Sequence, residues 1–122
     1  MASRVKEQEQ LERECDSMRG ELEKQLSLKE EKDRLRSFLR RGFCVEGRIA
    51  LIKAFHYAID QGKSFGDIIL CFEAEYHRVW KGQHIYIRGN PDADSVAGRQ
   101  TKVSIENIYK GLKIPPPPVA VR

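Results

Sequence analysis

The sequence predicts a mostly α-helical protein, and three observations support this fold class. Residues 4–41 contain no proline and are dense in the strong helix formers Glu, Lys, Arg, Gln and Leu. Two later segments place apolar residues at helical spacing, and one short stretch alternates as a strand does. We therefore expect a long N-terminal helix, an antiparallel helix hairpin, one short strand that pairs across a dimer, and a short C-terminal helix-turn-helix-like unit.

The segment 4–41 predicts a single long charged helix that Gly42 ends. It carries a short a/d seam, which consists of Leu11, Cys15, Met18 and Leu22. The heptad register breaks after this seam, so the predicted coiled coil is partial. We expect the end of the helix to pack on a partner through Leu35, Phe38 and Leu39.

The next two segments predict a helix hairpin that forms the core. Apolar residues make one stripe along a helix over Val45–Gln61, and Gly62 is the expected stop. Ser64 and Asp67 have the spacing of a capping box, which opens a helix to about Lys81. Its core face contains Phe65, Ile68, Ile69, Phe72, Tyr76, Val79 and Trp80.

A six-residue stretch, Gln83–Arg88, gives the clearest strand signal in the chain. Ile85 and Ile87 alternate with polar and aromatic neighbours. A lone strand cannot satisfy its own backbone groups, so a second copy of the chain is the simplest partner. We therefore predict a homodimer whose seam is formed by Gln83, His84, Ile85, Tyr86 and Ile87.

The C-terminal part predicts a turn at Gly89-Asn90-Pro91 and two short helices. The first covers Asp92–Gln100, Thr101-Lys102 form a tight turn, and Ser104 caps a last helix over Ile105–Lys113. Pro115–Pro118 are expected to adopt polyproline II. The chain thus divides into a charged helix over 1–41, a dimerisation unit over 42–90, a helix-turn-helix-like unit over 91–114 and a proline-rich tail over 115–122.

Composition favours a polyanion as partner and argues against a membrane protein. The formal net charge is +4, and the basic excess lies in residues 34–53 and 83–122. No apolar run is long enough to span a bilayer, and the N-terminus lacks the apolar region of a secretory signal. Three widely spaced cysteines are typical of a reducing compartment. We expect a cytoplasmic protein.

Catalytic and metal-binding patterns are weak in this sequence. His56, His77 and His84 lack metal-ligand spacing, and neither a C-x-x-C motif nor a glycine-rich phosphate loop is present. We therefore expect neither catalysis nor a cofactor nor a bound metal.

The segment after the helix hairpin resembles the Mor family of phage middle-operon transcription activators, over roughly residues 46–113. The matching residues are Gly82, Gln83, Ile85, Tyr86, Ile87, Val103, Ser104, Ile108 and Tyr109. The resemblance implies that the strand is the dimer seam and that a C-terminal helix-turn-helix grips DNA. Two features depart from the family: Lys102 occupies a turn where glycine is usual, and the helix that precedes the helix-turn-helix is missing.

We therefore predict a small dimeric DNA-binding transcription regulator of the type carried by phage or mobile elements. Its partner is double-stranded DNA, and the side chains expected to contact it are Arg99, Lys102, Ser104, Glu106, Asn107, Lys110 and Lys113.

Three alternatives remain open. The last helix can dock on the core without touching DNA. A ribbon of paired strands can read DNA through His84, Tyr86 and Arg88. In the third alternative the chain is a protein-interaction module, with a partner on the N-terminal helix and an aromatic groove that takes the proline tail.

Overall fold

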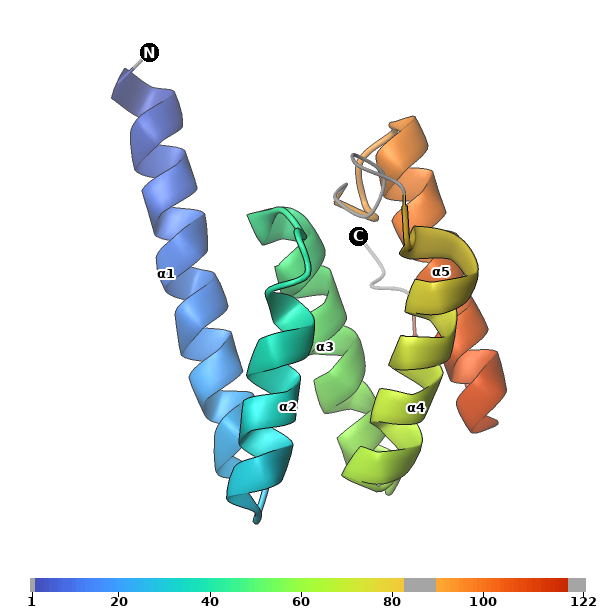
Figure 1. Cartoon of the computed structure of the whole chain (residues 1–122). Coiled ribbons are helices and arrows are strands. Elements are labelled where there is room, and N and C mark those ends of the chain that lie inside the picture. Colours follow the sequence, from blue (N-terminus) through green and yellow to red (C-terminus); the bar gives the residue numbers. More distant parts are fainter. Residues whose placement is uncertain (1, 83–89, 119–122) are drawn as a thin grey trace.

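The protein folds into a helical bundle around one central helix (Figure 1). The computed structural model describes residues 2–82 and 90–118, and these contain five α-helices and one π-helical turn. The central helix is α3, which contacts α1 on one side and α4 and α5 on the other. The elements are α1 (Ala2–Lys24), α2 (Lys29–Leu39), α3 (Val45–Asp60), α4 (Phe65–Glu75), η1 (Tyr76–Trp80) and α5 (Val96–Leu112).

The single long helix predicted over 4–41 is wrong, because the chain reverses direction at residues 25–28. Leu26 is buried within this reversal. The backbone N–H of Leu28 donates to the Glu31 carboxylate at 3.3 Å, which helps to start α2. The second helix then runs antiparallel to α1 (Figure 1) and buries Leu35, Phe38 and Leu39 in the core of the same chain.

The predicted seam of α1 is used within the chain. Cys15 and Leu22 are buried, Leu11 and Met18 are partly buried against the core, and α1 packs mainly on α3. The seam residues that were expected to form a partial coiled coil therefore already have an intramolecular partner. Residues 5–10, before this seam, are exposed.

The predicted helix hairpin is confirmed as α3 and α4. The Ser64 hydroxyl accepts a hydrogen bond from the Asp67 N–H at 3.2 Å, as the capping pattern predicts. Gly62 has a φ of +85°, which L side chains rarely adopt and which turns the chain between the two helices. The π-helical turn η1 extends α4 to Trp80, close to the predicted end at Lys81.

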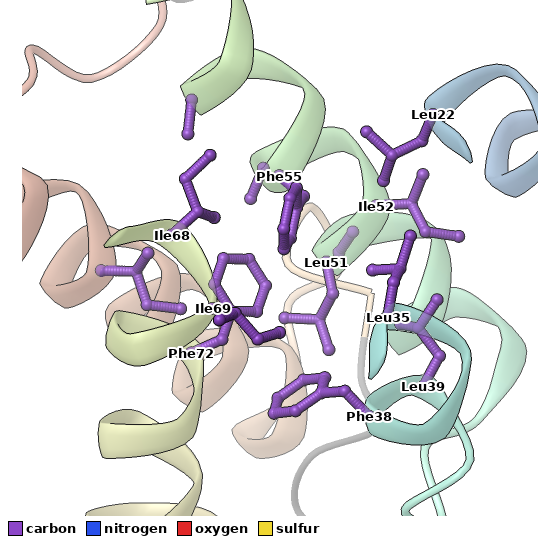
Figure 2. Packing of buried hydrophobic residues seen from close by; sticks show 14 of the residues in the cluster. Leu22, Leu35, Phe38, Leu39, Leu51, Ile52, Phe55, Ile68, Ile69 and Phe72 are labelled. Atoms are coloured by element: carbon purple, nitrogen blue, oxygen red, sulfur yellow. The ribbon is translucent and has the colours of Figure 1, made fainter. Parts of the chain in front are cut away.

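Aromatic rings from α2, α3 and α4 pack against one another in the core. Figure 2 shows Phe38 of α2, Phe55 of α3 and Phe72 of α4 among aliphatic side chains of the same helices. The ring centroids of Phe55 and Phe72 are 5.2 Å apart, and those of Phe38 and Phe72 are 5.7 Å apart. Such ring pairs stabilise packing beyond the burial of apolar area alone. The apolar face of α4 thus packs against both α2 and α3 and holds the bundle together.

The predicted helix-turn-helix over 91–114 is contradicted by α5, which is one continuous helix. Thr101 and Lys102, expected in a tight turn, lie in the middle of α5. The Thr101 hydroxyl donates to the Ala97 carbonyl at 3.0 Å, so this buried polar side chain is satisfied within the helix. The helix begins at Val96, and its N-cap is Ser95, whose hydroxyl accepts from the Gly98 N–H at 3.0 Å.

The strand predicted over Gln83–Arg88, and with it the dimer seam, lies outside the described residues. No helix in the described part of the chain is both long and apolar enough to cross a membrane.

Candidate nucleic-acid interface

A groove runs between α3 and α5, and the start of the C-terminal tail forms part of its wall. Its volume is about 800 Å³. Two alanines on α3, Ala50 and Ala54, leave room for it, while Ile105 and Tyr109 of α5 supply larger apolar groups. The prolines at positions 116–118 also line the groove.

Three lysines line the same groove. Lys53 comes from α3, and Lys102 and Lys110 come from α5. All three are exposed, and none forms an ion pair with another described residue. The carboxylates of Asp92 and Glu106 also line the groove, so its rim has a small positive excess.

Most arginines of the described chain, unlike the three lysines of the groove, form ion pairs with carboxylates. Arg41 makes two hydrogen bonds to Glu73, at 2.7 and 2.8 Å, and its guanidinium lies over the rings of Phe38 and Tyr76. The arginines in ion pairs are Arg19, Arg36, Arg41, Arg48, Arg78 and Arg99. The lysines of the groove, in contrast, form no ion pair with the described residues.

Five of the seven residues predicted to contact DNA lie on the surface of α5 or its C-cap. They follow one another at steps of three or four along the helix, which places them on one face. These residues are Arg99, Lys102, Glu106, Lys110 and Lys113. Arg99 forms an ion pair with Asp94 at 2.8 Å, and the other cations of this face are unpaired among the described residues.

The other two predicted DNA contacts are not on this face. Ser104 is fully buried, and its hydroxyl has no hydrogen-bond partner in the described chain. Asn107 is half-buried and donates from Nδ2 to Oε2 of Glu75 at 3.3 Å. Ser104 is therefore enclosed within the fold, and Asn107 is turned toward Glu75 of α4. Val103, between Lys102 and Ser104, is 51% exposed.

Sequence reasoning missed Lys53 and Tyr57 on α3 as part of the site. They are four residues apart and therefore lie on one face of α3. The predicted DNA contacts all came from the C-terminal segment, which does not contain these two residues. The Tyr57 hydroxyl donates to the Pro115 carbonyl at 2.5 Å, which fixes the start of the tail. Its ring packs against Tyr109 with centroids 5.3 Å apart. Burial, with a smaller effect of Tyr57, raises the pKa of Tyr109 to about 12.

Across residues 2–82 and 90–118, no group of three or more His, Cys, Asp or Glu side chains could hold a metal ion. The residues predicted for dimerisation, Gln83, His84, Ile85, Tyr86 and Ile87, lie outside these ranges.

Comparisons with protein-family models, with curated proteins and with solved structures find no match to this chain. The resemblance to the Mor family therefore stays a prediction from the sequence.

Proposed function

We propose that this protein binds double-stranded DNA, with the exposed face of α5 and Lys53 of α3 as the contact surface. The observation that carries the proposal is the group of three lysines around one groove that have no ion-pair partner among the described residues, whereas most described arginines pair with carboxylates. Lysines that are free of carboxylates can neutralise phosphates and release the counterions that surround DNA. This mode of binding replaces the helix-turn-helix expected from the sequence.

A continuous helix suits this role, because the major groove of B-DNA admits an α-helix. Lys102 and Lys110 are two turns apart on α5 and can reach phosphates on either side of the DNA major groove. Glu106 lies between them and can accept a hydrogen bond from a cytosine amino group. Asn107 is not part of the proposed contact surface, because its side chain contacts Glu75.

The dimer remains part of the proposal, since a second copy would double the phosphate contacts. It rests on the alternation of Ile85 and Ile87 in the sequence. Replacing Ile87 by proline removes a backbone donor and should split the dimer. Light scattering that still gives the mass of two chains for Ile87→Pro would move the seam elsewhere.

The contact surface is tested by a double variant, Lys102→Gln/Lys110→Gln, in a gel-shift assay on random-sequence duplex. We expect its affinity to fall about tenfold or more, and equally for every duplex, because phosphate contacts carry no sequence information. The matched control is Lys24→Gln/Lys29→Gln, which removes the same charge from exposed positions at the turn between α1 and α2. The control should bind as the unaltered protein does.

A further variant, Arg40→Gln, separates this proposal from a rival surface at the end of α2. Arg40 is exposed and makes no ion pair with another described residue, whereas Arg41 is held by Glu73 and serves the fold. Loss of binding in Arg40→Gln alone would place DNA at the end of α2. If the unaltered protein does not bind duplex, the alternative is a protein-interaction module, and the exposed residues 5–10 of α1 are its open surface.

A further inference from the structure

A second, smaller cavity lies on the other side of α3, where α1, α2 and α3 meet. Its volume is about 200 Å³, and four arginines line it: Arg19, Arg36, Arg40 and Arg48. One carboxylate, that of Asp16, shares the lining with Cys15 and Leu39. Four guanidinium groups around one small space are an unusual concentration of hydrogen-bond donors that are always charged.

Carboxylates around the cavity hold three of these arginines in place without using all of their donors. Arg19 and Arg36 both bond to Glu23, with Arg36 Nε at 3.1 Å from Oε2 and Arg19 Nη1 at 3.0 Å from the same atom. Arg48 Nη2 donates to Oε1 of Glu12 at 2.8 Å. Weaker pairs link Arg19 to Asp16 at 3.6 Å and Arg36 to Asp33 at 3.8 Å.

Two donors remain unmatched. The Nε of Arg48 is buried and has no hydrogen-bond partner in the described part of the chain. A buried donor without an acceptor destabilises the fold, so an acceptor in this place would be favoured. Arg40 has no carboxylate within ion-pair distance among the residues that the structure describes. Both side chains line the cavity.

We propose that this cavity binds a small tetrahedral oxyanion, inorganic phosphate or sulfate. The planar guanidinium fork matches the spacing of two oxygens on such an anion, and charge-assisted hydrogen bonds of this kind are short and strong. The volume accommodates one oxyanion, whereas pockets for larger ligands begin at about 300 Å³. Burial raises the pKa of the Cys15 thiol, which keeps a competing negative charge out of the cavity.

The site is independent of the DNA surface, because none of its arginines lies on the groove between α3 and α5. Bound anion would link α1, α2 and α3 through their arginines. It would therefore stabilise the N-terminal helix pair against the central helix, by the ordinary linkage between binding and folding.

Isothermal titration of the full chain with sodium phosphate, in a chloride buffer of constant ionic strength, tests the proposal. We expect saturable binding of one phosphate per chain, and about tenfold or more weaker binding in Arg40→Gln and in Arg48→Lys. Arg40→Gln breaks no ion pair in the described chain, and Arg48→Lys keeps the charge opposite Glu12 while removing Nε. The matched control is Arg34→Gln, an exposed arginine of α2 that does not line the cavity.

Three results would overturn the proposal. One is the absence of saturable binding. Another is equal binding by Arg40→Gln, Arg48→Lys and the Arg34→Gln control, which would place the anion elsewhere. The last is displacement of phosphate by a short DNA duplex, which would assign the arginines to the DNA backbone rather than to a free anion.

Discussion

Arg36 of α2 bonds to the buried carboxylate of Glu23 on α1 through two of its nitrogens, Nε and Nη2. Arg19, one turn before Glu23 on α1, donates to the same carboxylate at 3.0 Å. Glu23 is only 7% exposed, and hydrogen bonding to it raises the pKa of Arg36 further above its usual range. This contact fixes the antiparallel arrangement of α1 and α2, which no apolar pattern in the sequence specifies.

Replacing Glu23 by glutamine should therefore weaken the helix pair. The amide keeps the shape but loses the charge, and its NH2 group replaces one of the two oxygens that accept hydrogen bonds from Arg19 and Arg36. We expect a loss of about 1–3 kcal/mol in the free energy of unfolding, measured by urea denaturation. Glu21→Gln is the control, because Glu21 and its partner Lys24 are both well exposed. An equal loss of stability in the two variants would show that the contact of Glu23 with Arg19 and Arg36 does not hold α1 and α2 together.

Phe72→Ala tests the core. The ring is 1% exposed and contacts rings from α2 and α3, so its removal should cost about 3–5 kcal/mol. Leu70→Ala, two residues earlier on the same helix, removes a side chain that is 61% exposed. That variant should change stability by no more than about 0.5 kcal/mol. Similar losses in the two variants would mean that α4 faces the core with another side.

Gly98→Ala tests the close approach at the start of α5. A Cβ there would lie 2.4 Å from the carbonyl oxygen of Asn90 and 2.7 Å from that of Ala93, so backbone must move. We expect a loss of about 1–3 kcal/mol in thermal or urea unfolding. The same change at Gly66, in the first turn of α4, meets open space and should be neutral or stabilise by up to about 1 kcal/mol. Equal tolerance at both positions would contradict the packing of Asn90 against α5.

The raised pKa of Tyr109 predicts that the protein loses stability at alkaline pH. Its pKa is raised to about 12 in the folded state from an ordinary value of 10.0. Between these values the unfolded chain releases the phenol proton first, so the free energy of unfolding falls as the pH rises. Tyr109→Phe should lose less stability than the unaltered protein between about pH 9 and pH 11, as measured by urea melts at both values. An identical fall in both proteins would show that the phenol is solvated.

The sequence predicted the central hairpin well because its residues repeat cleanly. Ile52, Phe55 and Phe72 keep helical spacing, and Ser64 and Gly62 mark the helix ends. These local signals agree with the tertiary packing, so α3 and α4 lie close to their predicted positions.

The break between α1 and α2 was not predicted from the sequence. Residues 25–28 contain neither proline nor glycine, and Gln25, Leu26 and Leu28 favour helix. The only signals were the loss of heptad register after Leu22 and the Ser27-Leu28 step before two glutamates. The reversal depends on burying Leu26 and on the Glu23–Arg36 contact, which are tertiary effects that propensity does not contain.

The candidate site was predicted in part, because the basic face of α5 was found and the turn was misplaced. The sequence predicts a tight turn at Thr101-Lys102. However, Gly98, Thr101, Ile105, Ile108 and Leu112 continue one buried stripe through them. A small polar residue can lie in a helix interface when its hydroxyl bonds to the preceding turn. Lys53 and Tyr57 were missed because they join α5 only through the fold.

The most direct test of the proposed function is the salt dependence of binding to a random-sequence duplex, measured by fluorescence anisotropy. If the lysines around the α3–α5 groove contact phosphates, the logarithm of the binding constant falls linearly with the logarithm of salt concentration, by about 0.9 per phosphate. The slope for Lys102→Gln/Lys110→Gln should then be shallower by about two. An affinity that does not change with salt, or an equal slope in the double variant, would contradict the account.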